Sequence, residues 1–273
     1  MGGDHTGFTA GQLSGAFTPR CLAICGVCAG RPEWTELGDV VIADRVWRYD
    51  TGEQRNAVPG GRPTFKKDTE LFALSPTWLR AAENAKPWAR WPGRDRAWLD
   101  ARPRSLELQG LWLMKVLADG QQDPADHADV DRMCADWKDV VAQLKKDGHV
   151  VAGKLTDAGR EHLEGVLFEN KKRLPEPPPW ALHVAPMGTG NHLVRDVDIW
   201  ASLEDAQRLV CAFDMEASTI GVAGWSAQIP FLAVKGVMDF GLPDRHRGFR
   251  SFAARAAAEV LVRLLRTLVT PAA

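Results

Sequence analysis

The sequence predicts an α/β domain with a mixed sheet, interrupted by an inserted helical module. Short apolar runs alternate with helical patterns in residues 1–100 and again in residues 179–273, which is the pattern of an α/β domain. Residues 101–178 differ, because they carry helical patterns and end in the proline-rich run Pro175–Pro179, which is typical of a stiff linker. We therefore expect one α/β domain in two parts, with the module between them.

In the first part, apolar and polar patterns predict two strands, a loop and a helix. The strands are expected at Cys21–Val27 and at Gly38–Ala43, the second extended through Trp47. The loop is expected at residues 50–64 and the helix at Leu71–Ala85. The glycines of Gly26–Gly30 predict that the first strand runs into a tight loop, whose backbone amides could face a phosphate or a sugar hydroxyl. An ordinary structural turn is the equal alternative for a motif this short.

In the module, the order of elements is helix, helix, small hairpin and helix, which is the order of a winged helix. The patterns lie at Leu106–Leu117, Asp129–Leu144, His149–Leu155 and from Thr156 onward. Thr156 is expected to cap the last of these helices through its hydroxyl oxygen.

The second part again alternates strands with helices. Three strands are expected at Trp180–Met187, Val210–Phe213 and Pro230–Val237, and three helices at Leu203–Leu209, Ala217–Ser226 and Phe249–Leu268. The segment Met187–Val194 follows the first of these strands and contains two glycines, so it could bring backbone amides against a flat ligand. An ordinary glycine loop is the alternative.

Composition and charge exclude several classes of protein. With 273 residues, 45% of them apolar and 25% charged, the chain has ample material for a core. A formal net charge of −1 gives no electrostatic case for nucleic acid or acidic lipid as the main partner. No apolar run is long enough to span a bilayer, and no basic-then-apolar signal opens the chain. We therefore expect a cytoplasmic protein without a membrane partner.

The five cysteines do not indicate a disulfide framework or a metal cluster. Their number is odd, and Cys21, Cys25 and Cys28 match the C-x-x-x-C-x-x-C spacing of radical iron–sulfur enzymes. On a strand, however, four residue steps would separate the first two thiols by roughly 13 Å. Buried, free thiols are the better interpretation. No other group of His, Cys and Asp has the spacing of metal ligands, so we expect no metal and no cofactor.

Two carboxylates, Glu216 and Asp239, each follow an apolar segment, and together they predict a catalytic pair. One carboxylate can accept hydrogen bonds from sugar hydroxyls while the other passes a proton to a leaving group. That division of roles suits cleavage of a glycosidic bond, in which positive charge builds up on the sugar ring. Each residue also has a simpler interpretation. Glu216 could merely cap the helix that follows, and Asp239 could bond to its own backbone before Gly241.

Taken together, four motifs resemble the nucleoside phosphorylase and nucleosidase superfamily, most closely its methylthioadenosine/S-adenosylhomocysteine nucleosidase-like branch. They are Gly26–Gly30 with Leu37–Ala43, Gly188–Asp196, Phe213–Ser218 and Val234–Asp239, and the resemblance covers roughly residues 1–97 and 180–273. It implies a three-layer α/β domain with a mixed sheet, and a purine nucleoside or nucleotide as substrate. It also implies a homo-oligomer, because family members pair subunits across the active site.

The resemblance implies a role for each matching residue. Asp239 matches the acid that protonates or hydrogen-bonds the purine so that the base leaves neutral. Met215 and Glu216 match the ribose-binding pair, in which the glutamate accepts from the 2′-hydroxyl and steadies the cationic sugar.

The same resemblance implies five further substrate-binding positions. Ala29 and Gly30 match the loop beside the ribose and the nucleophile. Leu193 falls where the family often has a purine-stacking phenylalanine, and Val194 where backbone contacts to the base are made. Met238 precedes the acid, at a position where close nucleosidases have a serine.

The N-terminus departs from the family pattern. Gly2–Phe17 looks like the family's glycine-initiated helix, which implies that the opening strands are absent, together with the carboxylate there that activates the attacking water. Three hypotheses about this pocket therefore stay open: a nucleosidase, a catalytically inactive nucleoside sensor, and a phosphorylase with Arg45 or Arg195 as phosphate ligand.

The charge of the module distinguishes between DNA and protein as its partner. Acidic and basic side chains are nearly balanced over residues 136–173, and no basic stripe is present. DNA binding at physiological salt would therefore be poor, which disfavours a transcription regulator. We expect residues 105–170 to contact a protein partner.

Overall fold

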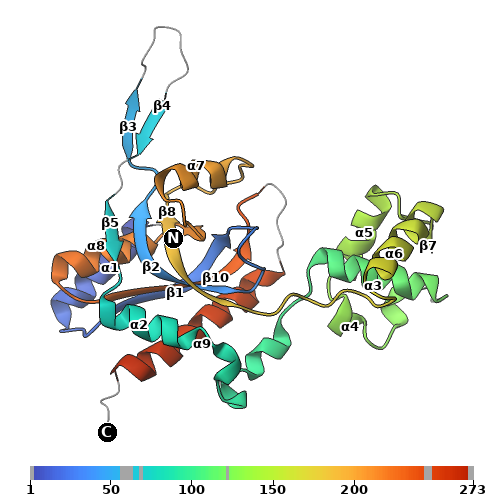
Figure 1. Ribbon diagram of the computed structural model, residues 1–273, viewed down its shortest axis with the longest axis horizontal. Helices are drawn as coiled ribbons and strands as arrows, with labels where there is room; N and C mark the ends of the chain where they lie inside the picture. Colours follow the sequence, from blue (N-terminus) through green and yellow to red (C-terminus); the bar gives the residue numbers. More distant parts are fainter. Residues whose placement is uncertain (1–2, 56–63, 68–69, 121–122, 243–247, 270–273) are drawn as a thin grey trace. The chain divides into compact units, whose positions relative to one another are not determined.

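The computed structural model describes residues 3–55, 64–67, 70–120, 123–242 and 248–269. Its chain divides into two compact units, one formed by residues 1–101 and 180–273 and the other by residues 102–179 (Figure 1). Among the described helices, none is long and apolar enough to cross a membrane.

The larger unit is built on a mixed sheet, as the sequence predicts. Its six described strands are β1 (Leu22–Gly30), β2 (Val40–Arg48), β5 (Leu71–Ala73), β8 (Leu182–Thr189), β9 (Ala212–Asp214) and β10 (Phe231–Asp239). Strand β1 runs parallel to β10 and β8 runs parallel to β2 and β9, whereas β1–β9, β2–β10 and β2–β5 are antiparallel. The pairings β10–β1–β9–β8–β2–β10 close into a ring, and β5 extends it from β2.

Helices cover the sheet on both faces. They are α1 (Gly3–Ala16), α2 (Pro76–Ala85), α7 (Ile199–Ala206), α8 (Ala217–Ala227) and α9 (Phe249–Val269). The alternation of side chains along β2 produces two separate cores. Val41 and Ala43 pack on the side of α8, whereas Val40 and Ile42 pack with α9 and a group of tryptophans around Trp180.

Three sequence predictions in this unit were wrong, each because of a strand pairing that the local patterns do not reveal. Strand β1 does not turn into a loop at Gly26–Gly30 but continues to Gly30, because β9 pairs with its last residues. A helix does not begin at Leu71, because Leu71–Ala73 pairs with β2 and α2 begins only at Pro76. The loop expected at residues 50–64 contains β3 (Gly52–Arg55), which pairs with β4 (Thr64–Lys67), and residues 56–63 lie outside the described part.

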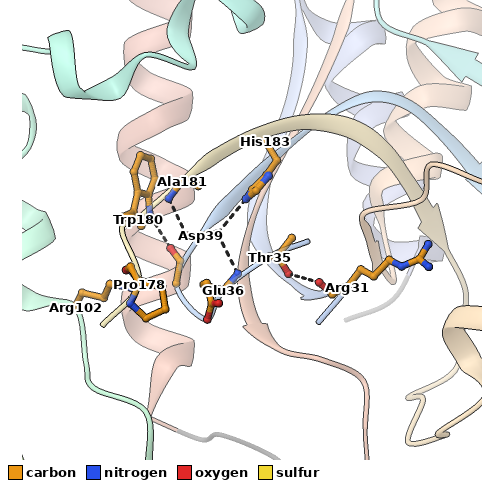
Figure 2. A network of polar contacts seen from close by, with 10 residues as sticks. Arg31, Thr35, Glu36, Asp39, Arg102, Pro178, Trp180, Ala181 and His183 are labelled. Carbon is orange, nitrogen blue, oxygen red and sulfur yellow. Dashed lines mark hydrogen bonds and ion pairs between the residues drawn. The ribbon is translucent and has the colours of Figure 1, made fainter. Parts of the chain in front are cut away.

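A buried aspartate joins the turn before β2 to the start of β8 (Figure 2). The carboxylate of Asp39 accepts hydrogen bonds from the backbone amides of Glu36 (3.0 Å) and Ala181 (2.8 Å), and Nε2 of His183 lies 2.9 Å from it. Beside it, the indole N–H of Trp180 donates to the carbonyl of Gly38 at 2.7 Å. Two segments that are 142 residues apart in sequence are thereby fixed to each other.

The smaller unit has a core of its own. Its elements are α3 (Leu106–Ala118), α4 (Val130–Met133), α5 (Trp137–Lys146), the hairpin β6 (Val150–Val151) and β7 (Lys154–Leu155), and α6 (Asp157–Glu169). The hydroxyl of Thr156 accepts from the Gly159 amide and caps α6, which confirms that prediction. The helix expected at Asp129–Leu144 is split into α4 and α5. At the split, buried Gln109 bonds to both the backbone and the side chain of Asp136. The winged-helix class and the protein partner of this unit stay predictions.

Replacing Asp39 with alanine should lower the free energy of unfolding by about 2–4 kcal/mol, because two backbone amides and the ring of His183 lose a buried partner. Urea unfolding followed by circular dichroism measures this difference. The exposed Asp100 is the matched control, and Asp100→Ala should change stability by less than about 0.5 kcal/mol. Equal effects of the two substitutions would contradict the structural role of Asp39.

Candidate functional site

A cavity of about 400 Å³ lies where β1 and β10 end and where β9 runs into α8. Because β1 and β10 are parallel, their carboxyl ends meet at one edge of the sheet, which is where α/β sheets bind ligands. The walls include Val27 and Cys28 from β1, Phe213 and Asp214 from β9, and Arg250 from the first turn of α9. Five stretches spread along the sequence therefore line one space.

Both predicted catalytic carboxylates, Glu216 and Asp239, line this cavity. The predicted binding residues Ala29, Leu193, Val194, Met215 and Met238 line it as well.

Gly30 is placed differently from the other predicted binding residues, since it is not among those that line the cavity. It is buried against Thr35 and Val237, and a β-carbon there would lie 2.3 Å from the Thr35 hydroxyl oxygen. Gly30 therefore shapes the cavity only by letting two segments pack closely behind it.

The carboxylate of Glu216 is held by a buried lysine. The ammonium of Lys235 lies 2.9 Å from Glu216 and 2.7 Å from Asp214. The side chains of Lys235 and Asp214 are only 2% and 1% exposed, whereas that of Glu216 is 21% exposed and reaches the cavity. Burying an ammonium is costly unless it is paired, and here two carboxylates pair with it.

Charge, rather than burial, determines the protonation of Lys235. Burial lowers the pKa of its ammonium, but the charges of Asp214 and Glu216 and the hydrogen bonds to them raise it by more. The net result is a pKa above the ordinary lysine value, so Lys235 is positively charged across the physiological pH range.

The start of α8 is capped without any contribution from Glu216. Glu216 occupies the N-cap position but makes no capping hydrogen bond, so the interpretation of Glu216 as a helix cap is wrong. The Asp214 carboxylate accepts instead from the Ala217 amide, and the Thr189 hydroxyl accepts from the Ser218 amide while donating to Asp214. Glu216 is therefore left to face Lys235 and the cavity.

Asp239 is buried, and its carboxylate accepts a hydrogen bond from the Gly241 amide at 3.0 Å. The simpler interpretation of Asp239 was that its side chain bonds to its own backbone before Gly241, and this hydrogen bond is present. The same side chain also lines the cavity, so the two interpretations of Asp239 are compatible.

Sequence analysis missed Lys235, Asp214 and Thr189. A signal was available for Lys235, because it is the one charged residue inside the apolar strand Phe231–Met238. A charge that interrupts a buried strand needs a buried partner, and in the structure Lys235 finds it in Asp214 and Glu216.

The thiols at β1 are free, but Cys25 is exposed and Cys21 is half-buried, so among them the prediction of buried thiols holds only for Cys28. Cys25 and Cys28 lie on β1 and Cys21 just before it, as the strand interpretation requires. Burial, with smaller effects from nearby carboxylates, holds the pKa of Cys28 well above its usual range, and burial raises the pKa of Cys21 to about 12. Among the described residues, no group of three His, Cys, Asp or Glu side chains could hold a metal ion.

Comparison with known proteins identifies the fold. No family model matches the chain. The uncharacterized protein y4jS of Sinorhizobium fredii (strain NBRC 101917 / NGR234) is 21% identical over 272 residues, which cover 98% of this chain and 48% of y4jS. The chain thus spans about half the length of this curated relative.

Solved structures of nucleosidases share the fold. A 5′-methylthioadenosine/S-adenosylhomocysteine nucleosidase from Neisseria meningitidis, in complex with methylthio-immucillin-A, superposes with a TM-score of 0.55 at 14% identity over 98% of this chain and 78% of that one. The S-adenosylhomocysteine nucleosidase from Streptococcus pyogenes, in complex with 5-methylthiotubericidin, gives 0.52 at 15% identity over 98% and 76%. The nucleosidase from Colwellia psychrerythraea, in complex with adenine, gives 0.54 at 12% identity over 98% and 75%. The larger unit therefore has the nucleosidase-like α/β fold that the sequence motifs predicted.

Replacing Lys235 with methionine should lower the free energy of unfolding by about 3–5 kcal/mol, because it leaves two carboxylates without their buried counter-charge. Urea unfolding at neutral pH measures the loss. The partly exposed pair Arg45–Asp44 provides the control, since Arg45→Met should cost only about 0–1 kcal/mol.

The contribution of Lys235 should also depend on pH. Because its pKa is raised in the folded state, the stabilisation is complete below the ordinary value of 10.5 and is lost as pH rises through the folded-state pKa. The stability difference between wild type and K235M should therefore be constant from about pH 8 to pH 10 and shrink above that range. A difference that grows above pH 10.5 would contradict the ion-pair assignment.

Labelling with a thiol reagent at pH 8 should modify Cys25 rapidly and the other four cysteines slowly. Cys25 is exposed, whereas burial raises the pKa of Cys21, Cys134 and Cys211 to about 12 and that of Cys28 well above its usual range. Absorbance of the released thiolate counts the fast-reacting groups. Cys25→Ser should abolish the fast phase, and all five thiols should react in urea.

Proposed function

We propose that this chain cleaves the N-glycosidic bond of a purine nucleoside or nucleotide by hydrolysis, releasing the free base and a ribosyl product. The observation that carries the proposal is the convergence of Glu216 and Asp239 on one cavity, with the Glu216 carboxylate fixed by Lys235. Two carboxyl groups with different partners suit a reaction that needs both an acid and a stabiliser of positive charge.

In this proposal Asp239 serves the leaving base. A purine leaves more readily when a proton or a strong hydrogen bond neutralises the charge that develops on its ring. Asp239 lies at the end of β10, where the Gly241 amide fixes its orientation, and its side chain lines the cavity. A protonated Asp239 would donate to a ring nitrogen of the purine.

Glu216 serves the sugar. Its carboxylate would accept a hydrogen bond from a ribose hydroxyl and face the cationic ring of the transition state. Lys235 fixes that carboxylate from behind, so little reorganisation is required when the charge develops. The neighbouring Met215 adds an apolar surface beside the ribose.

The remaining walls suit a flat, apolar base. Phe213, Leu193, Val194 and Met238 supply apolar surface, and the volume of about 400 Å³ lies within the range of small-molecule pockets. The similar structures from Neisseria meningitidis and Colwellia psychrerythraea are complexes with a nucleoside analogue and with adenine, which supports a purine ligand here.

Phosphorolysis is the second candidate, and one observation favours it. Neither Arg45, which pairs with Asp44, nor Arg195 is among the residues that line the cavity, whereas Arg250 is. A guanidinium at this position could bind a phosphate ion next to the sugar.

Incubation with 5′-methylthioadenosine, S-adenosylhomocysteine or adenosine should release adenine, measured by chromatography. Asp239→Asn should lower kcat by about 10²–10⁴-fold, the usual contribution of a general acid. Glu216→Gln should also lower kcat by at least about tenfold while preserving the size of the side chain. Asp100→Asn, on an exposed side chain outside the cavity, is the control and should leave the rate unchanged.

The same assay separates the alternatives. Base release that requires phosphate and is lost in Arg250→Gln would indicate a phosphorylase. Saturable binding of these nucleosides by calorimetry without base release would indicate an inactive sensor. If the chain neither binds these nucleosides nor releases the base, all three hypotheses are refuted.

A further inference from the structure

A second cavity, of about 450 Å³, lies between α2, the short 3₁₀ turn Trp88–Arg90 and the C-terminal half of α9. It shares no lining residue with the cavity that contains Glu216 and Asp239. Nothing in the proposed nucleosidase reaction uses it, so its chemistry has to be judged independently.

Three arginines from three separate elements converge on this second cavity. Arg80 comes from α2, Arg90 from the 3₁₀ turn and Arg263 from α9. Among the described residues that line the cavity, no carboxylate side chain is present. A concave space lined by one sign of charge concentrates the field and attracts ions of the opposite sign.

Only one of the three guanidinium groups is paired within the described part of the chain. Arg263 lies 2.6 Å from Asp95 and stacks on the ring of Trp91, with 4.5 Å between the guanidinium carbon and the ring centroid. No described carboxylate forms an ion pair with Arg80 or Arg90. The cavity therefore has positive charge that its own residues do not neutralise.

Part of this arrangement is rigid. The indole N–H of Trp91 donates to the carbonyl of Ala85 at the end of α2, which fixes the ring on which Arg263 stacks. The guanidinium also donates a hydrogen bond from Nη1 to the Asp95 carboxylate, which fixes it further. A guanidinium held in this way loses little side-chain entropy when an anion binds.

The other groups at the cavity indicate the kind of anion. Asn84 brings an amide, Thr77 a hydroxyl, and Ala81 and Leu264 apolar surface. Arginine is well suited to phosphate, because its planar fork donates two parallel hydrogen bonds to neighbouring oxygens. The volume exceeds what a single phosphate ion needs and lies within the range of small-molecule sites.

From these observations we infer that this second cavity binds a phosphate-bearing small molecule, either a polyphosphate or a phosphate ester. Arg80 and Arg90 contact the phosphate oxygens, and the fixed Arg263 forms the third side of the site. The inference does not depend on the proposed nucleosidase activity, because the two cavities have no residue in common.

Isothermal titration calorimetry of the full chain tests this inference at physiological ionic strength. Inorganic pyrophosphate is the probe for a polyphosphate, and glycerol 3-phosphate is the probe for a phosphate ester. We expect saturable binding of at least one probe with one site per chain. In the double variant R80Q/R90Q, Kd for that probe should rise at least about tenfold, since each charge-assisted hydrogen bond contributes substantially.

Two further variants make the result decisive. R208Q/R255Q removes the same charge from exposed positions outside the second cavity and should leave Kd unchanged. R80K/R90K keeps the charge but removes the bidentate geometry, so it should give an intermediate Kd and guards against misfolding of the glutamine variant. Absence of saturable binding to both probes, or an equal Kd in R80Q/R90Q and R208Q/R255Q, would overturn the inference.

Discussion

The buried ammonium of Lys235 is the interaction on which the architecture of the candidate active site depends. It lies on β10 and binds carboxylates from the end of β9 and the start of α8. Its partner Asp214 also caps α8, so a single charge network fixes a strand end, a helix start and the floor of the cavity. Burying these charges costs free energy, and this cost is offset only while all members of the charge network are present. Removal of any one member is therefore expected to disrupt the geometry of the whole network. Such a network orients Glu216 more firmly than apolar packing would.

The topology explains why such a network can form at all. Because the strands close into a ring, β10 lies between β1 and β2, and the ends of β1, β9 and β10 meet around one space. Asp39 adds a second tie to this arrangement, between the turn before β2 and the start of β8. The sheet therefore holds the carboxylates, while the more exposed segment with Leu193 and Val194 closes the side of the cavity.

Local sequence signals were sufficient where a residue's surroundings are set by its own strand or helix. Glu216 and Asp239 were identifiable because each follows an apolar run, and the cap at Thr156 needed only its own helix. The predictions failed where pairing with a distant segment determines the local secondary structure. Gly26–Gly30 has the composition of a turn, but β9 extends β1 through it, and pairing with β2 makes Leu71–Ala73 a strand. Lys235 shows an intermediate case, since the sequence marks its charge as anomalous but does not reveal which carboxylates pair with it.

The two carboxylates at the cavity are held in physically different ways, and this difference supports the roles proposed for them. Glu216 is paired with the buried ammonium of Lys235, which fixes its side chain at the wall of the cavity, in position to accept hydrogen bonds. Asp239 accepts from a backbone amide of its own turn, which orients the side chain without supplying a full counter-charge at that contact. In the proposed reaction Glu216 would face the sugar and Asp239 the leaving base, so the partners of each carboxylate orient it for its proposed role.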